Sequence, residues 1–284
     1  MDANTLARSV KELVSLPRAY HRIGRMLDDP RANSSDVGKV IAHEPALAAR
    51  ILRLVNSAYF NLPSRVDNIP LAITILGGRS LRNVVLATSV TSAFARISSR
   101  LVDMSDFWHH SVYCGLMARA LALRLEKRQA EQCFLAGLLH DLGKLVIYHH
   151  LPEEAGRILS DLESRGGPVQ SVEQEILGFT HADVGRELFR QWQLPEVFQC
   201  TTAYHHAPET AKGYVMETCL VHVADALTKK VEPGNKVAYE DDGMPPLSEF
   251  VRNRVPLTPE LVDDLRLEVD LQTVELVATL FGDP

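Results

Sequence analysis

Hydrophobic residues recur at three- and four-residue steps along almost the whole chain. The segments "ALAARILRLVNSAYF" (46–60) and "SVYCGLMARALALRLE" (111–126) show this spacing clearly. It is the spacing of a helix that buries one face. Runs that alternate polar and apolar residues between turn signals are missing. The pattern therefore predicts an all-α protein of roughly a dozen helices.

Three helix starts are marked by residues that commonly cap a helix N-terminus. Ser34 or Ser35 precedes "DVGKVIAH", Ser105 precedes "DFWHHSVYCGL", and Thr258 precedes "PELVDDL" with proline in the first helical position. Short hydroxyl side chains accept hydrogen bonds from the first amides of a helix, and proline fits its first turn. We expect helices to begin at these residues.

Two short motifs favour structural interpretations. "ILGGRS" (75–80) lacks the spacing of a phosphate-binding loop, so we predict a tight turn between two helices. "NSAYFNLP" (56–63) is interpreted as a helix end that packs Tyr59 and Phe60, rather than as a ligand site.

A polar stretch, "ARISSRLVDMSD" (95–106), separates two helical blocks. We predict an N-terminal helical subdomain over residues 1–98, packed on a second subdomain over residues 105–284 that includes the C-terminal helices. The second block holds most of the eleven histidines. The charged stretch from Lys229 to Pro246 predicts a long loop, suited to cover a site or to contact a partner.

The composition is that of a globular protein, with 46% hydrophobic and 23% charged residues among 284. A net charge of -6 gives no electrostatic basis for non-specific binding of nucleic acid. The N-terminus does not resemble a secretory signal, and no apolar run of about 18 residues predicts a bilayer span. The cysteines lack paired spacing, so we expect buried thiols in a reducing, cytoplasmic environment. They are Cys114, Cys133, Cys200 and Cys219.

The second block distributes imidazoles and carboxylates over separate predicted helices. The candidates are His110, His140, Asp141, His181, His205, His206 and Asp225. Helices packed in a bundle can project such side chains into one shared pocket. Imidazole and carboxylate suit iron, manganese, nickel or zinc, and the lack of thiolates argues against a purely structural zinc site. A buried carboxylate without a lysine or arginine partner needs a cation.

These candidates exceed what one metal ion requires. Two ions bridged by Asp141 would use them better, and such a pair can activate a water for phosphoryl hydrolysis. Each histidine taken alone is instead typical of a structural residue. His109 and the pair His149–His150 are expected to face solvent, and His205–His206 could interact with the negative pole of a helix.

The order His110, His140–Asp141, Asp225 resembles the motif of the HD superfamily of metal-dependent phosphohydrolases. His181 and the pair His205–His206 resemble ligands of its dinuclear members. "HDLGK" (140–144) is similar to the HDxGK of HD-GYP cyclic-di-GMP phosphodiesterases, which implies that Lys144 lies near the phosphate. The chain departs from these enzymes because no proline follows Gly213–Tyr214, and Ala207 stands in place of a glutamate.

A second resemblance extends over the N-terminal block. "LVSLPRAYHRIGRMLDDP", "IAHEPALAARILRLVNSAYFNLPSRVDNIPLAITILGGRSLRNVVLA" and "HADVGRELFRQWQLPE" resemble the HDOD domain. The resemblance extends from Leu13 to Leu227 and implies a bacterial module found with signalling proteins.

The resemblance implies two ions, with iron or manganese favoured and nickel or zinc also compatible. One ion would be held by His110, His140, Asp141 and Asp225. The other would share Asp141 and take His181 and one of the pair His205–His206, with His205 preferred. His222 would support the ligands from behind, and Asp106 lies where HD-GYP enzymes have an extra acidic ligand for a third ion.

Three functions fit these observations. In the first, the metal pocket binds a nucleotide or phosphorylated small molecule, or is structural, and the surface engages a signalling partner. In the second, the protein is a phosphohydrolase with Asp141 and Lys144 as its catalytic residues. The third is an oxygen-dependent di-iron oxidase. The missing GYP element and the association with signalling favour the first.

Overall fold

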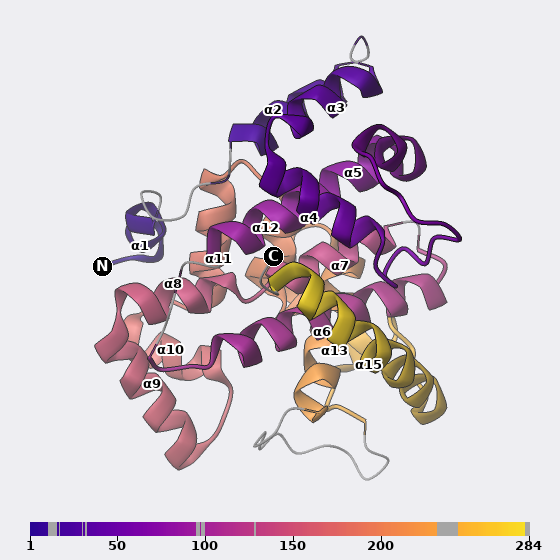
Figure 1. Cartoon of the computed structure of the whole chain (residues 1–284). Helices are drawn as coiled ribbons and strands as arrows, with labels where there is room; N and C mark the ends of the chain where they lie inside the picture. The colour runs from indigo at the N-terminus through magenta and orange to yellow at the C-terminus, as the bar shows by residue number, and fades with distance from the viewer. Residues whose placement is uncertain are drawn as a thin grey trace. The chain divides into compact units, whose positions relative to one another are not determined.

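The computed structural model describes residues 1–10, 16, 18–29, 31, 33–94, 97, 100–127, 129–231 and 244–281. Within these ranges the regular elements are all helices, which confirms the predicted all-α class (Figure 1). Of the predicted loop from Lys229 to Pro246, residues 232–243 lie outside the described residues.

Two compact units make up the chain. Unit 1 comprises Met1–Leu13 and Ile97–Asp270, and unit 2 comprises Val14–Arg96 and Leu271–Pro284. The helices of unit 1 are α1 (Ala3–Ser9), α6 (Met104–Arg124), α7 (Ala130–Leu139), α8 (Leu142–His150), α9 (Pro152–Arg165), α10 (Val169–Leu177), α11 (His181–Gln191), α12 (Glu196–Tyr204), η2 (Pro208–Thr210), α13 (Val215–Val231) and α14 (Glu249–Arg252). Unit 2 contains α2 (Arg18–Asp28), α3 (Ser34–Ala42), α4 (Pro45–Val55) and α5 (Ile69–Phe94). The last helix, α15 (Pro259–Phe281), contributes residues to both.

The two units differ at both chain ends from the predicted subdomains, which were residues 1–98 and 105–284. Helix α1 belongs to unit 1, because its fully buried Leu6 and Ala7 pack it against α8 and α11. The C-terminal segment from residue 271 belongs to unit 2, where the Glu275 carboxylate accepts a hydrogen bond from the Ala58 amide at 3.0 Å.

Helix α5 in unit 2 is interrupted at Gly77. The φ angle of Gly77 is 70°, a left-handed value that favours glycine, so the predicted turn in "ILGGRS" is confirmed. By length and composition, α5 is the one helix in the described parts of the chain that could cross a bilayer. Its buried Leu81, Val84 and Val85 explain this apolar composition as that of a core helix.

The motif "NSAYFNLP" forms a closed helix end. The Asn56 side-chain amide donates to the carbonyl oxygens of Leu52 and Val66, and its oxygen accepts from the Val66 amide, each at 2.7 Å. Tyr59 is buried and meets the Phe60 ring edge to face at 4.8 Å between centroids. These contacts agree with the structural interpretation of the motif.

Two of the three predicted helix caps are wrong. Asn33, rather than Ser34 or Ser35, accepts the hydrogen bond that begins α3, and Asp103, rather than Ser105, accepts the one that begins α6. Asparagine and aspartate cap as well as serine does, so the pattern did not discriminate between neighbours. Thr258 is confirmed, since its hydroxyl accepts from the Leu261 amide at 3.3 Å ahead of Pro259.

The four cysteines are all free thiols. Cys114, Cys133 and Cys219 are buried as predicted, whereas Cys200 is only half-buried.

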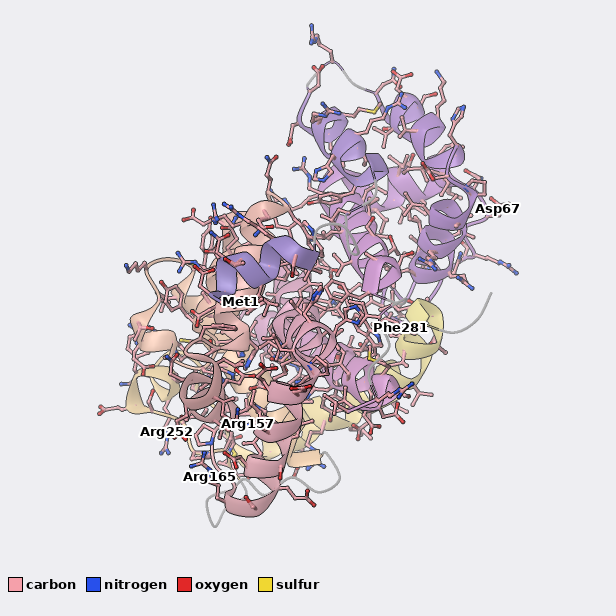
Figure 2. All side chains as sticks on the ribbon, turned by 90° about the vertical axis from the view of Figure 1, so that its left-hand side faces the viewer. Met1, Asp67, Arg157, Arg165, Arg252 and Phe281 are labelled. Atoms are coloured by element: carbon pink, nitrogen blue, oxygen red, sulfur yellow. The ribbon has the colours of Figure 1, made fainter. Side chains whose placement is uncertain are left out.

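Helix α10, which precedes His181 in the chain, is stabilised mainly through its buried face. Arg165, labelled near the end of α9 in Figure 2, pairs with Glu175 of α10 at 2.7 Å. Both side chains are at least half exposed, so this pair contributes about 1 kcal/mol or less. Val172 and Glu173 are buried instead and define the inward face of α10.

Close backbone contacts at glycine set the geometry of unit 1. Helices α6 and α7 pack where a Cβ on Gly137 would lie 2.8 Å from the carbonyl oxygen of Cys114. Helices α8 and α11 cross at Gly143, where a Cβ would overlap the carbonyl oxygen of His181. This crossing brings the start of α8, which follows Asp141, next to the start of α11.

We predict that Gly143→Ala destabilises the protein by about 3 kcal/mol or more, because the backbones of α8 and α11 must separate. Thermal unfolding followed by circular dichroism measures the effect. The matched control is Gly156→Ala in α9, where the nearest atom lies 4.0 Å from the added Cβ. That control is expected to stabilise slightly, and equal midpoints for the two variants would contradict the prediction.

Candidate metal centre

Seven predicted side chains meet in unit 1, although they come from five places in the chain. His110 lies on α6 and Asp225 on α13. His140 and Asp141 occupy the break between α7 and α8, and His181 begins α11. His205 and His206 follow α12. All are buried except His206, which is half-buried.

Four of these residues form a cluster that we call site 1. His110 Nε2 lies 3.4 Å from Asp225 Oδ1 and 3.5 Å from Asp141 Oδ2. His140 Nε2 lies 3.3 Å from the same oxygen of Asp141 and 3.7 Å from Asp225 Oδ1. The two imidazole nitrogens are 3.5 Å apart.

The other oxygen of Asp141 faces a second cluster, site 2. His181 Nε2 lies 3.2 Å from Asp141 Oδ1, 3.4 Å from His205 Nε2 and 3.0 Å from His206 Nε2. His205 Nε2 lies 3.7 Å from Asp141 Oδ1. Both histidines of the pair therefore face site 2, where the resemblance implied only one.

These separations fit metal coordination. Ligand atoms bound to a common ion at about 2.0–2.1 Å lie about 3–3.4 Å from their neighbours. Asp141 Oδ1 and Asp225 Oδ1 are also buried, and they face imidazole nitrogens of the described residues rather than a lysine. A cation at each site would compensate these buried carboxylate oxygens. The residues present thus fit metal binding, and Asp141 faces both clusters.

The imidazole rings are oriented for this role by their opposite nitrogens. Nδ1 of His140 lies 2.6 Å from the Gly137 carbonyl oxygen, and Nδ1 of His205 lies 2.8 Å from that of Thr202. Because a carbonyl oxygen only accepts, each Nδ1 donates its proton, and Nε2 is directed into the cluster. Metal-ligating histidines are held in this way.

Glu173 orients His181 and was missed in the sequence. Its Oε2 accepts from both the backbone amide of His181 at 2.8 Å and its Nδ1 at 2.6 Å. This is the carboxylate–histidine arrangement that makes a ligand more basic. A signal was present, since Glu173 stands beside Val172 on the helix face that carries the core residues of α10.

Of the other polar residues singled out in the sequence, one supports a candidate ligand and the rest lie outside the two clusters. His222 Nδ1 lies 2.7 Å from the backbone carbonyl of His205, so it supports a candidate ligand as expected. His109 and His149 are exposed as predicted, whereas His150 is half-buried. Asp106 is exposed and belongs to neither cluster, although it lines a neighbouring pocket.

The expectation that the buried carboxylates lack lysine partners is wrong. Lys144 Nζ lies 2.5 Å from Asp141 Oδ2, and Lys229 Nζ lies 2.6 Å from Asp225 Oδ2. Helical spacing of three and four residues places each lysine beside its aspartate. The two ion pairs supply part of the positive charge that was assigned to metal alone.

The electrostatic environment divides the histidines into two kinds. Burial opposes a charge on His140 and His181, but the carboxylates of Asp141 and Glu173 outweigh it and raise the pKa of both. Burial and the neighbouring imidazoles hold the pKa values of His205 and His206 well below their ordinary range. Protons therefore compete with a metal ion more strongly for His140 and His181 than for His205 and His206.

A pocket of about 440 Å³ adjoins site 1. Its walls include His109 and His110 of α6, Asp141, Lys144 and Tyr148 around α8, and Lys229 of α13. The pocket thus combines two candidate metal ligands with two ammonium groups.

Residues 13–208 match the HDOD domain, and the chain belongs to the HDOD domain family. The fold is similar to that of an HDOD domain protein of unknown function from Geobacter sulfurreducens, with a TM-score of 0.76, 22% identity and 98% of each chain covered. It is also similar to a candidate phosphohydrolase from Shewanella amazonensis SB2B, with a TM-score of 0.75, 24% identity and 97% of each chain covered.

An uncharacterised protein of Treponema pallidum (strain Nichols) is 27% identical over 218 residues. The match covers 75% of this chain but 42% of that relative, so the chain spans less than half of the relative's length.

We predict that Glu173→Gln weakens metal binding about ten-fold or more, because His181 loses the charge that makes it basic. Calorimetric titration with Mn²⁺ measures the affinity. Glu175→Gln on the same helix is the control, since Glu175 is exposed and pairs with surface Arg165. Equal affinities for the two variants would contradict the assigned role of Glu173.

Metal affinity is also predicted to rise with pH. The raised pKa values of His140 and His181 keep both protonated above the ordinary value of about 6.5, so protons compete with metal at neutral pH. Apparent Mn²⁺ affinity should therefore increase between about pH 6 and about pH 8, with protons released on binding. Calorimetric titration in buffers of different ionisation enthalpy counts these protons. Metal binding without proton release would contradict the assignment of His140 and His181 as metal ligands.

Proposed function

We propose that this protein is a signalling module in which a dinuclear metal centre binds a phosphorylated small molecule, such as a nucleotide. The supporting observation is the position of Asp141, whose two oxygens face two histidine clusters beside a pocket with two lysines. A signalling protein would receive the output of this binding event, as the resemblance to signalling modules implies.

The donor set indicates which metals fit. All seven candidate ligands are imidazoles or carboxylates, a combination that suits iron or manganese and also accepts nickel or zinc. Divalent ions supply Lewis acidity that polarises phosphoryl oxygens. His205 and His206 offer neutral nitrogens, because burial lowers their pKa values.

The pocket supplies groups that suit a phosphate ester. Lys144 and Lys229 line it and provide positive charge, and His109 and Tyr148 are further polar residues of its lining. A volume of about 440 Å³ lies within the range of small-molecule sites.

A second candidate function is a metal-dependent phosphohydrolase. The complete set of ligands around a bridging carboxylate favours it, because paired ions can hold both the attacking and the leaving oxygen of a phosphoryl group. Asp141 would then hold the two ions, and Lys144 would stabilise charge on the phosphoryl oxygens.

Protein purified without added metal is predicted to contain transition metal, up to two equivalents, and Asp141→Asn is predicted to lose it while remaining folded. The physical reason is that Asp141 is the one ligand shared by both sites. Elemental analysis measures the content. Asp161→Asn on the surface of α9 serves as the control, because its partner Arg165 is half exposed. A wild-type protein that neither contains nor takes up metal would contradict the proposal.

Ligand binding separates the two candidate functions. The signalling module should bind nucleotides or inorganic phosphate in a metal-dependent manner, without turnover of bis(p-nitrophenyl) phosphate. Turnover that requires metal and disappears in Asp141→Asn would instead establish the phosphohydrolase.

A further inference from the structure

Lys144 contacts the one oxygen of Asp141 that site 1 requires. Its Nζ lies 2.5 Å from Asp141 Oδ2, and the same oxygen lies 3.3 Å from His140 Nε2 and 3.5 Å from His110 Nε2. The Lys144 side chain is 14% exposed and that of Asp141 is 2% exposed, so solvent screens this ion pair little. The ammonium group therefore competes with any cation that binds site 1.

The other candidate metal-binding oxygens differ in this respect. Asp141 Oδ1, which faces site 2, and Asp225 Oδ1, which faces site 1, lie near imidazole nitrogens of the described residues and not against a lysine. Lys229 binds Asp225 through Oδ2, the oxygen on the other side of that carboxylate. The contact of Lys144 with Oδ2 thus distinguishes site 1 from site 2.

We propose that Lys144 blocks site 1 by its ion pair with Asp141, an arrangement that we call the lock. A metal ion then fills site 2 first and fills site 1 only by displacing the Lys144 ammonium from Asp141. This inference rests on the proposed metal centre and concerns its regulation. The protein would change between a one-metal and a two-metal state as the metal concentration changes.

The pocket beside site 1 offers space for a displaced ammonium group. Lys144 lines the pocket of about 440 Å³, together with Tyr148 and Asp106. A phosphate in this pocket would attract the ammonium away from Asp141 and thereby favour metal at site 1. Because such coupling is reciprocal, metal at site 1 would strengthen phosphate binding equally.

Stepwise titration with Mn²⁺ tests the lock. The wild-type protein is expected to show two steps that differ by roughly ten-fold or more in affinity. Lys144→Gln should tighten the weaker step by a similar factor and abolish most of the gain caused by inorganic phosphate. Lys229→Gln is the matched control, because it removes a lysine from the oxygen outside site 1, and it should change the weaker step by less than about three-fold.

The order of filling has its own test. Asp225→Asn removes a ligand of site 1 alone, so it should eliminate the weaker step and leave the tighter one. Loss of the tighter step would overturn the proposal, as would two equal steps in the wild type or an unchanged weaker step in folded Lys144→Gln.

A measurement on the wild type covers the case in which Lys144→Gln fails to fold. Labelling with an amine-reactive reagent, read by mass spectrometry, should modify Lys144 faster after the second equivalent of Mn²⁺ than before it. A rate that stays constant or falls would overturn the lock. Absence of any metal binding would instead refute the proposed function itself, so the two failures are distinguishable.

Discussion

The structure of the candidate site depends on how one buried carboxylate is shared. Asp141 is 2% exposed and stands at the break between α7 and α8, with one oxygen toward His110 and His140 and the other toward His181 and His205. A carboxylate in this position is stable only if charge compensates both oxygens. Lys144 compensates one of them, whereas the other faces the imidazoles of His181 and His205, where a metal ion would replace protons. This incomplete compensation is the physical reason to assign a metal centre.

The fold around Asp141 maintains this arrangement. The contact between Gly143 and the His181 backbone fixes the start of α8 against the start of α11. Glu173 then holds His181 through two hydrogen bonds, and backbone carbonyls hold His140 and His205. Each ring is thus oriented from outside the cluster, which is the preorganisation that a tight metal site requires.

Much of the fold and of the candidate metal centre could be predicted from the sequence, but the ion pairs within the centre could not. Helical periodicity predicted the all-α class, and the residue types of the histidine and aspartate series identified the members of the cluster. Patterns along the chain could not show that Asp141 and Asp225 each meet a lysine, since Lys144 and Lys229 are equally compatible with solvent-facing positions. Glu173 was missed because a carboxylate on a core-facing position is uncommon without a known partner. The two compact units have other bounds than the predicted subdomains, because α1 and residue 271 onward join their units through tertiary contacts.

The most direct test of the bridged metal centre is a crystal structure of the protein loaded with Mn²⁺, with anomalous scattering recorded at the manganese edge. The account predicts two peaks about 3.5–4 Å apart, one on each side of the Asp141 carboxylate. A single peak that does not contact Asp141, or no peak among the seven residues in a loaded crystal, would contradict it.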